Sequence, residues 1–290
     1  MNIFRAARDI LIPATCVVCG RTLLQHERHI CLHCLADMPF TYHRLGGRNA
    51  MADAFNALIQ RGLQRREALA DDGAWAADGS TEAVSNLEPY APAAAVFYYE
   101  GDYANITQAL KYGGNVALGR FFASLAAERV LGIADGPAPD SRSSPFRGSP
   151  PFSGANVVLP GLARRQSFDA VIPVPLHWRR RFSRGLNQAE VIAREIARQL
   201  GVPCRSDILR RRRSTHSQTT LGTDDRLSNV AGAFTARPKA LSSLPEQSNL
   251  LLIDDVFTTG STLYACREAL LKIRRDFNIS ILTLAFAHPS

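Results

Sequence analysis

Apolar residues follow two different periods along this chain, and the alternation between them is clearest in its second half. Short apolar runs typical of buried strands occupy residues 94–99, 168–175, 204–209, 231–235, 250–253 and 279–287. Apolar positions at helical spacing mark residues 103–110, 117–131, 185–200 and 263–273. Strands that alternate with helices predict a mostly parallel sheet with helices on both faces. The predicted fold class is therefore α/β.

Two stretches interrupt this pattern. Residues 46–92 are rich in Ala, Asp and Gly, with short helical stretches expected at 52–63 and 65–70. Residues 134–167 carry much of the chain's proline together with Ser, Gly and Arg, a composition that predicts a disordered or loosely packed insertion. The chain accordingly divides into an N-terminal module at 1–45 that opens with a short helix, a partly helical linker at 46–92, and an α/β domain at 93–290.

Composition and charge narrow the possible classes of protein. Of the 290 residues, 46% are hydrophobic and 21% are charged, and no apolar run reaches the roughly 18–20 residues of a membrane helix. Arg5, Arg8 and Asp9 interrupt the apolar pattern of the N-terminus, which argues against a secretory signal, so we expect a cytoplasmic protein. The net charge is +8, and its cations are nearly all Arg. Arginine binds phosphate in a bidentate manner, so this bias suits phosphorylated ligands or nucleic acid, although genome composition produces the same bias.

Four of the six cysteines form two C-x-x-C pairs separated by eleven residues: Cys16 and Cys19, then Cys31 and Cys34. Each pair can present two thiolates to one metal, and two pairs complete a tetrahedral sulfur shell around zinc. Disulfides are the alternative, which a cytoplasmic chain disfavours. The neighbouring His26, His29 and His33 are alternative ligands. Four thiolates leave no open position for chemistry, so we predict a structural zinc site that folds the N-terminal module.

The most informative segment for chemistry spans residues 250–262, where an apolar run is followed by two acids and a glycine turn. Backbone N–H groups at such a turn, together with the positive end of the following helix, form an anion site. Gly260 lets the backbone close around a phosphate, and side-chain hydroxyls add donors at Thr258, Thr259, Ser261 and Thr262. Asp254 and Asp255 would repel a phosphate, but they suit sugar hydroxyls or a divalent cation. The segment predicts a site for a phosphorylated sugar.

Two other interpretations fit residues 250–262 less well. The two acids could simply end a strand and cap a turn. A P-loop would require the pattern G-x-x-x-x-G-K-[ST], whereas this loop contains no Lys and its acids precede the glycine.

Further polar segments suit a polyanionic ligand. Residues 177–188 place a histidine and four arginines between a predicted strand and a predicted helix, although a solvated basic loop would look similar. Within them, Arg184, Asn187 and Gln188 form the tightest pattern. Residues 210–228 are basic and polar with little to fold on their own, which is typical of a mobile cover. Lys111, one of three lysines, ends a helix before a Gly-Gly pair, where an ordinary helix cap explains it nearly as well.

The segment at 250–262 closely resembles the phosphoribosyl-pyrophosphate (PRPP) signature of type I phosphoribosyltransferases. The chain as a whole resembles the ComF family of amidophosphoribosyltransferase-like competence proteins, in which a small zinc module precedes a type I phosphoribosyltransferase domain. This resemblance is carried by residues 16–34, 110–113, 171–176, 184–188, 218–234 and 251–263. The insertion at 134–167 departs from the compact family pattern.

The resemblance implies specific roles for the matching residues. Asp254 and Asp255 would hold the ribose as the catalytic pair, and residues 258–262 would bind the 5′-phosphate. The pyrophosphate loop would lie at Val174, Pro175 and Leu176. Mg²⁺ would accompany the PRPP, and the protein would serve DNA uptake or the handling of imported DNA or nucleotides.

Two classes of function are compatible with these features. The first is a glycosyltransferase that moves the 5-phosphoribosyl group from PRPP to a nitrogen nucleophile, with charge stabilised by backbone amides, arginines and Mg²⁺. The second is a non-catalytic module that senses PRPP or a nucleoside monophosphate and contacts single-stranded DNA or a helicase or processing protein of the uptake machinery. Only Trp178 and Phe182 lie among the basic runs, which makes a base-stacking platform weak. Consumption of PRPP would distinguish the two classes.

Overall fold

A computed structural model describes residues 14–71, 90–133, 167–176, 186–212 and 232–287. At its centre is a four-stranded sheet in the order β1-β6-β5-β2, in which every neighbouring pair is parallel. Its strands are β1 (Ala93–Tyr98), β2 (Ala170–Pro173), β5 (Asn249–Phe257) and β6 (Asn278–Phe286). The prediction of an α/β fold with a mostly parallel sheet is confirmed.

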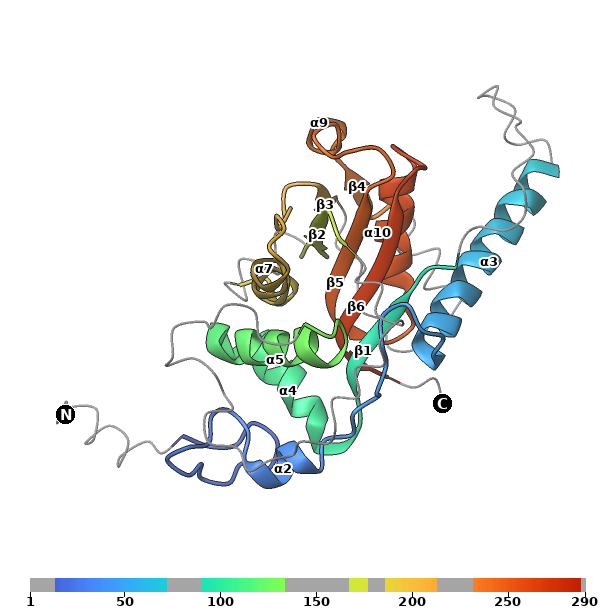
Figure 1. Cartoon of the computed structure of the whole chain (residues 1–290). Coiled ribbons are helices and arrows are strands. Elements are labelled where there is room, and N and C mark those ends of the chain that lie inside the picture. The colour runs from blue at the N-terminus through green and yellow to red at the C-terminus, as the bar shows by residue number, and fades with distance from the viewer. Residues whose placement is uncertain (1–13, 72–89, 134–166, 177–185, 213–231, 288–290) are drawn as a thin grey trace, which may run out of the picture.

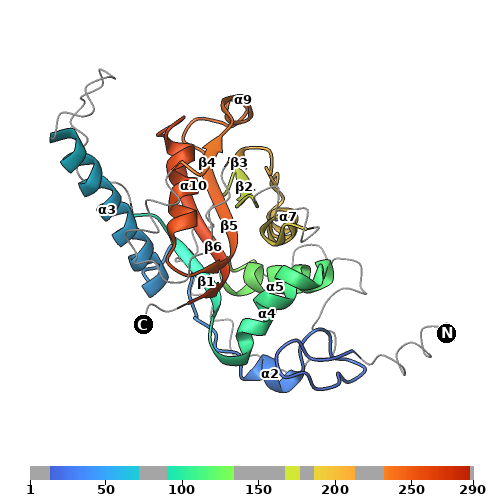
Figure 2. The same cartoon turned by 180° about the vertical axis from the view of Figure 1, so that it is seen from behind.

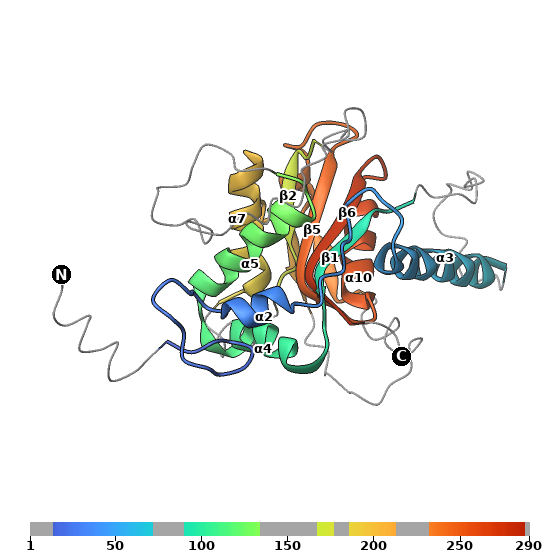
Figure 3. The same cartoon turned by 60° about the horizontal axis from the view of Figure 1, so that its bottom comes forward.

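Helices cover both faces of this sheet, and Figure 3 shows the three layers side by side. The helices of one face are α5 (Val116–Arg129) and α7 (Gln188–Leu200), with α4 (Ala104–Gly113) beside α5. The helices of the other face are α3 (Ala50–Asp71) and α10 (Ser261–Leu271). The Gly201 that follows α7 adopts the left-handed conformation expected of a C-terminal cap.

Successive residues of β5 explain why its sequence is continuously apolar. Leu251 and Ile253 pack in the core beneath α5 and α7, whereas Leu250 and Leu252 pack in the core beneath α3 and α10. All four side chains are fully buried. A parallel strand covered on both faces has no polar face to show, so its apolar residues do not alternate with polar ones.

The four-cysteine module occupies the described residues from 14 to 45 and contains the short helix α2 (Leu32–Ala36). In Figures 1 and 2 it lies against α4 at one end of the molecule. Val18, Ile30 and Met38 are buried in the same core as α5 and α7. The following segment runs along β1: the N–H of Thr41 donates to the carbonyl of Val96 (3.0 Å), and the N–H of Tyr98 donates to Pro39 (2.8 Å). The module is therefore attached to the sheet by both packing and backbone hydrogen bonds.

Residues 50–71 form the single helix α3, where the sequence indicated two short helical stretches. Met51, Phe55 and Leu58 are buried in the core that α3 shares with the sheet and α10. Many of the remaining positions are alanines or polar residues, so the apolar stripe is narrow and its periodicity is weak. Burial against the sheet stabilises this helix more than its own sequence does.

Several predicted boundaries are corrected by the structure. β5 continues to Phe257 because its last residues remain paired with β6, which is equally long. β2 ends at Pro173 rather than at residue 175, since proline has no N–H to continue a ladder. Of the predicted strand at 204–209, Cys204 forms one parallel bridge with Val171, and Leu209 belongs to a different, antiparallel strand. The N-terminal helix and the insertion up to residue 166 lie outside the described residues.

A small antiparallel sheet stands beside the main one. It pairs β3 (Leu209–Arg211) with β4 (Phe234–Ala236), and the helix α9 (Pro238–Leu241) follows it. The strand predicted at 231–235 thus begins later, at Phe234. In Figure 1 this sheet and α9 lie at the end of the main sheet where β5 begins.

Candidate functional site at the carboxyl ends of the strands

The acidic pair lies at the carboxyl end of β5. The described sheet leaves this end of β5 unpaired on the side of β2, because β2 stops at Pro173, opposite Ile253, while β5 continues along β6. The backbone N–H of Asp255 donates to Oδ1 of Asp254 (2.9 Å). Ligands of open α/β sheets bind at this edge, because adjacent strand ends and helix N-termini meet there. The two carboxylates therefore occupy the place where the fold positions a ligand.

Burial and mutual repulsion act on the protonation of this pair. Burial, and then the negative charge of Asp255, raise the pKa of the Asp254 carboxyl well above its ordinary value of 3.8, while Lys111 acts in the opposite direction. Two adjacent carboxylates at a partly dry position hold their charge best when a cation lies close by. Lys111 supplies one positive charge here, and a divalent cation would supply more.

The two carboxylates are associated with opposite faces of the sheet. Asp255 Oδ2 lies 3.4 Å from Nζ of Lys111, at the end of α4. Asp254 interacts with the other face, where α10 lies. Burial, and then the negative charge of Asp254, raise the pKa of the Cys266 thiol in α10. Successive side chains of a strand point to opposite faces, which accounts for this division. Cys266 itself is fully buried, as its place on the apolar face of the helix predicted.

The turn after β5 depends on a glycine. Gly260 has φ of +72° and is the N-cap of α10. A Cβ at this position would lie 2.6 Å from Cζ of Phe257 and 2.8 Å from Cδ1 of Leu58 in α3. Both the left-handed backbone and the close packing therefore exclude a side chain. Since glycine offers no capping acceptor, the N–H groups of the first turn of α10 are available to an anion.

Hydroxyl groups surround this helix start. Oγ1 of Thr259 lies 3.0 Å from Oγ of Ser261, within hydrogen-bond distance. Ser261 is buried, Thr259 and Thr262 are half-buried, and Thr258 is exposed. The turn thus offers donors at several depths beside the start of α10.

The segment after β2 joins the same edge. The N–H of Val174 donates to the carbonyl of Ile253 (2.9 Å), which places Val174 next to the acidic pair. Nδ2 of Asn187 donates to the carbonyl of Val174 (3.1 Å) and so ties the start of α7 to this segment. Pro175 and Leu176 follow and are half-buried.

Gln188 forms the first turn of α7. It is 4% exposed, and its Nε2 has no hydrogen-bond partner among the residues that the structure describes. The structure thus brings together the predicted residues of the acidic pair, the glycine turn, the segment after β2, and Lys111. Arg184 and the basic segments at 177–185 and 213–228 lie outside the described residues.

The four cysteines converge on one point. Their Sγ atoms all lie within 4.8 Å of one another, and Sγ of Cys19 is 3.9 Å from that of Cys31. Zinc–sulfur bonds of about 2.3 Å in a tetrahedron separate the sulfurs by about 3.8 Å. The N–H of Cys31 also donates to Sγ of Cys16 (3.3 Å). The cluster therefore has the geometry of a site that could hold a metal ion.

Hydrogen bonding favours a thiolate at Cys16, whereas burial and the neighbouring cysteines raise the pKa of Cys34. Burial tends to raise the pKa of Cys16, but the backbone N–H groups of Cys19 and Cys31 outweigh it and lower the pKa to about 7. A thiolate is the form in which cysteine binds a metal.

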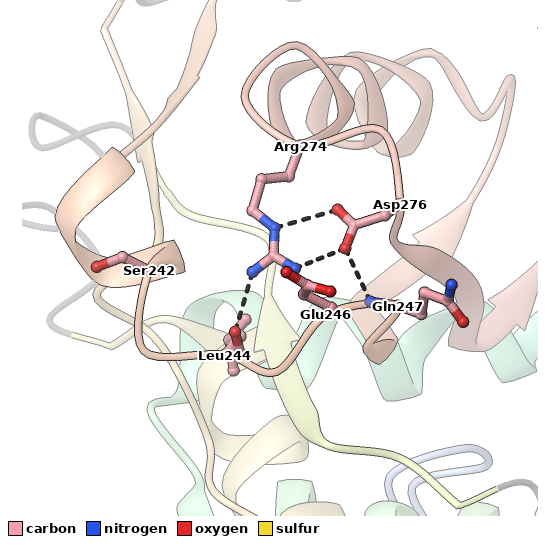
Figure 4. A pocket seen from close by; sticks show the side chains of 6 residues that line it. All are labelled: Ser242, Leu244, Glu246, Gln247, Arg274 and Asp276. Carbon is pink, nitrogen blue, oxygen red and sulfur yellow. Dashed lines mark hydrogen bonds and ion pairs between the residues drawn. The ribbon is translucent and has the colours of Figure 1, made fainter.

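A separate surface pocket, shown in Figure 4, lies at the opposite ends of the strands, between α9 and the turn before β6. It is lined by Ser242, Leu244, Glu246, Gln247, Arg274 and Asp276. Arg274 donates to the carbonyl of Leu244 (2.9 Å) and to both carboxylate oxygens of Asp276 (2.6 and 3.1 Å). These bonds fasten the turn that precedes β6, so the pocket is a structural feature away from the acidic pair.

Sequence reasoning missed the residues that connect the cysteine module to the site. Oη of Tyr103 donates to the carbonyl of Cys34 (3.0 Å), and Nδ2 of Asn105 donates to that of Val18 (3.2 Å). Both residues lie at the start of α4, the helix that ends with Lys111. Neither contact has a sequence signal, because each joins a side chain to a distant backbone carbonyl. Leu58, which closes the floor of the glycine turn, was missed because it lay in a stretch predicted to be a linker.

Comparison with known proteins agrees with this geometry. The Phosphoribosyl transferase domain family matches residues 186–289. The chain is 36% identical to "Competence protein F" of Haemophilus influenzae over 105 residues, which is 36% of this chain and 45% of that protein. It is 33% identical over 105 residues to "DNA utilization protein YhgH" of Escherichia coli K12, covering 44% of that protein. Each match thus spans less than half of the relative.

The described helices include none with both the length and the apolar character that crossing a membrane requires.

The segment matched by the family contains α7, the small sheet, β5, the glycine turn, α10 and β6, and so includes the acidic pair. Together with the four-cysteine cluster, these matches support a phosphoribosyltransferase-like protein similar to the competence and DNA utilization proteins, and each match spans less than half of the relative's length.

Proposed function

We propose that the carboxyl edge of the sheet binds PRPP or a nucleoside 5′-monophosphate together with Mg²⁺. The observation that carries this proposal is the order of groups at the end of β5: two adjacent carboxylates, then a glycine turn that leads into a helix N-terminus. The helix start suits a 5′-phosphate, and the carboxylates suit a ribose diol. Mg²⁺ is bound in proteins mainly through carboxylates and the phosphates of its ligand, and this arrangement can supply both.

The reaction that best fits this ligand is transfer of the phosphoribosyl group to a nitrogen nucleophile. As pyrophosphate departs, positive charge develops on the ribose and negative charge on the leaving group. Asp254 and Asp255 would hold the ribose hydroxyls and oppose the positive charge. The backbone after Val174 would face the pyrophosphate, and Arg184 would contribute its guanidinium. Bound Mg²⁺ would neutralise the diphosphate.

Substitution of both acids by Asn tests this site. Asn keeps the shape of the side chain but removes the charge, so the D254N/D255N protein should fold normally and lose affinity for PRPP with Mg²⁺ by calorimetry. A loss of about 100-fold corresponds to about 2.7 kcal/mol. The matched control is Glu246→Gln, which removes an exposed acid at the opposite end of the strands and should leave binding unchanged. Equal PRPP affinity in the wild type and the double variant would refute the assignment.

A second function is favoured by the cysteine module and by the names of the relatives, which refer to competence and DNA utilization. In this alternative the module holds zinc, and the chain senses a nucleotide within the DNA-uptake machinery. Its contact would be single-stranded DNA or a helicase or processing protein. The discriminating measurement supplies PRPP, Mg²⁺ and a panel of bases: release of pyrophosphate supports the transferase, whereas binding without turnover supports the sensor.

A further inference from the structure

Lys111 lies where a cation would be expected to meet the acidic pair. Its Nζ is 3.4 Å from Oδ2 of Asp255, and the side chains of the two residues are 27% and 16% exposed. Fully exposed ion pairs contribute little because water and salt screen them. This pair is largely removed from solvent, so its ammonium neutralises the carboxylate more effectively than a surface lysine would.

The charge of the site is incomplete without Lys111. Asp254 and Asp255 are adjacent in the chain, and Nζ of Lys111 lies 3.4 Å from Oδ2 of Asp255. One ammonium beside two carboxylates leaves at most one net negative charge. A divalent cation that bound Asp255 would carry the same sign as Lys111 and compete for the same oxygen atoms.

The backbone that carries Lys111 is held firmly. The start of α4 is bonded to the cysteine module through Tyr103 and Asn105. The preceding Leu110 is 2% exposed, within the core that α5 and α7 share. The helix then ends at Gly114 in the left-handed conformation. The ammonium can therefore leave Asp255 by rotation of its own four-carbon side chain, without movement of α4.

We propose that Lys111 is a positioning residue that acts as the built-in counter-ion of Asp255 and is displaced by the divalent cation that arrives with the ligand. In the free protein it holds the Asp255 carboxylate in place and weakens binding of a bare metal ion. When metal and ligand bind together, the released ammonium remains at the edge of the site and contacts a phosphate oxygen. The second part rests on the proposed function, whereas the first part concerns only the protein and a metal ion.

Mn²⁺ alone, followed by electron paramagnetic resonance of the full-length protein, tests the first part. Lys111→Met should bind Mn²⁺ about tenfold more tightly than wild type, a change of about 1.4 kcal/mol. Lys111→Arg, which keeps the charge, should resemble wild type. Lys239→Met is the matched control, because it removes the same charge from an exposed position in α9 and should leave Mn²⁺ affinity unchanged.

The opposite effect is expected for the complete ligand. At saturating Mg²⁺, Lys111→Met should bind PRPP about tenfold more weakly than wild type. Unchanged or weaker Mn²⁺ binding by Lys111→Met, in a protein that melts like wild type, would overturn the counter-ion proposal. If instead the Mn²⁺ result holds and wild type binds no PRPP, the counter-ion proposal stands and the proposed function fails.

Discussion

Substitution of Gly260 by Ala should destabilise the protein and disturb the glycine turn. Two costs combine at this position. An L-residue held at φ of +72° pays about 1–2 kcal/mol. The added Cβ would also lie 2.6 Å from Phe257 and 2.8 Å from Leu58, and forcing extra carbon into a packed core costs about 1–3 kcal/mol. The expected loss in the free energy of unfolding is therefore about 2–5 kcal/mol.

Gly201 offers a matched control for the first of these costs. It has nearly the same backbone angle, φ of +71°, but a Cβ added there would meet no atom within 4 Å. Gly201→Ala should therefore lose only about 1–2 kcal/mol. Urea unfolding followed by circular dichroism gives both values by linear extrapolation. Equal losses in the two variants would refute the claim that the floor of the turn, formed by Phe257 and Leu58, excludes a side chain.

Three further predictions concern other parts of the molecule. Purified protein should contain one zinc ion per chain by metal analysis. Cys16→Ser or Cys34→Ser should release it, because three thiolates cannot close a structural tetrahedron. Metal-free protein with these cysteines oxidised would instead indicate disulfides. Replacement of residues 134–167 by a short Gly/Ser linker should leave the melting temperature and PRPP affinity nearly unchanged. The reason is that the free-energy cost of loop closure varies by only about 0.6 kcal/mol per doubling of loop length. A variant that folds but does not bind PRPP would contradict this. Hydrogen bonds from Arg274 and from the N–H of Gln247 lower the pKa of Asp276 from 3.8 to about 2. This carboxylate therefore stabilises the folded state above pH 4, and the contribution disappears as the pH falls toward 2. Acid titration of unfolding should be shallower for Asp276→Asn over that interval, and identical curves would show that the pair contributes nothing.

The sequence by itself determined which segments form the strands, the two cysteine pairs and the glycine turn after β5, because each depends on residues close together in the chain. The apolar run at 250–253 must be buried on both sides, and the glycine turn that follows it prepares a helix start with free N–H groups. The C-x-x-C pairs likewise bring their thiolates together locally. The ends of strands and helices depend on tertiary contacts instead, since pairing with the neighbouring β6 decides where β5 ends.

Tertiary structure alone decided which distant residues meet. The sequence is equally compatible with Lys111 as part of a helix cap and as a site residue. Only the packing of α4 beside the sheet brings it to Asp255. The helix α3 carried too weak a periodicity to reveal that Leu58 closes the floor of the turn at Gly260. The bonds from Tyr103 and Asn105 to the cysteine module end on backbone carbonyls, which every residue possesses. Such contacts leave no pattern in a single sequence, because the chain must fold before the two groups are near each other.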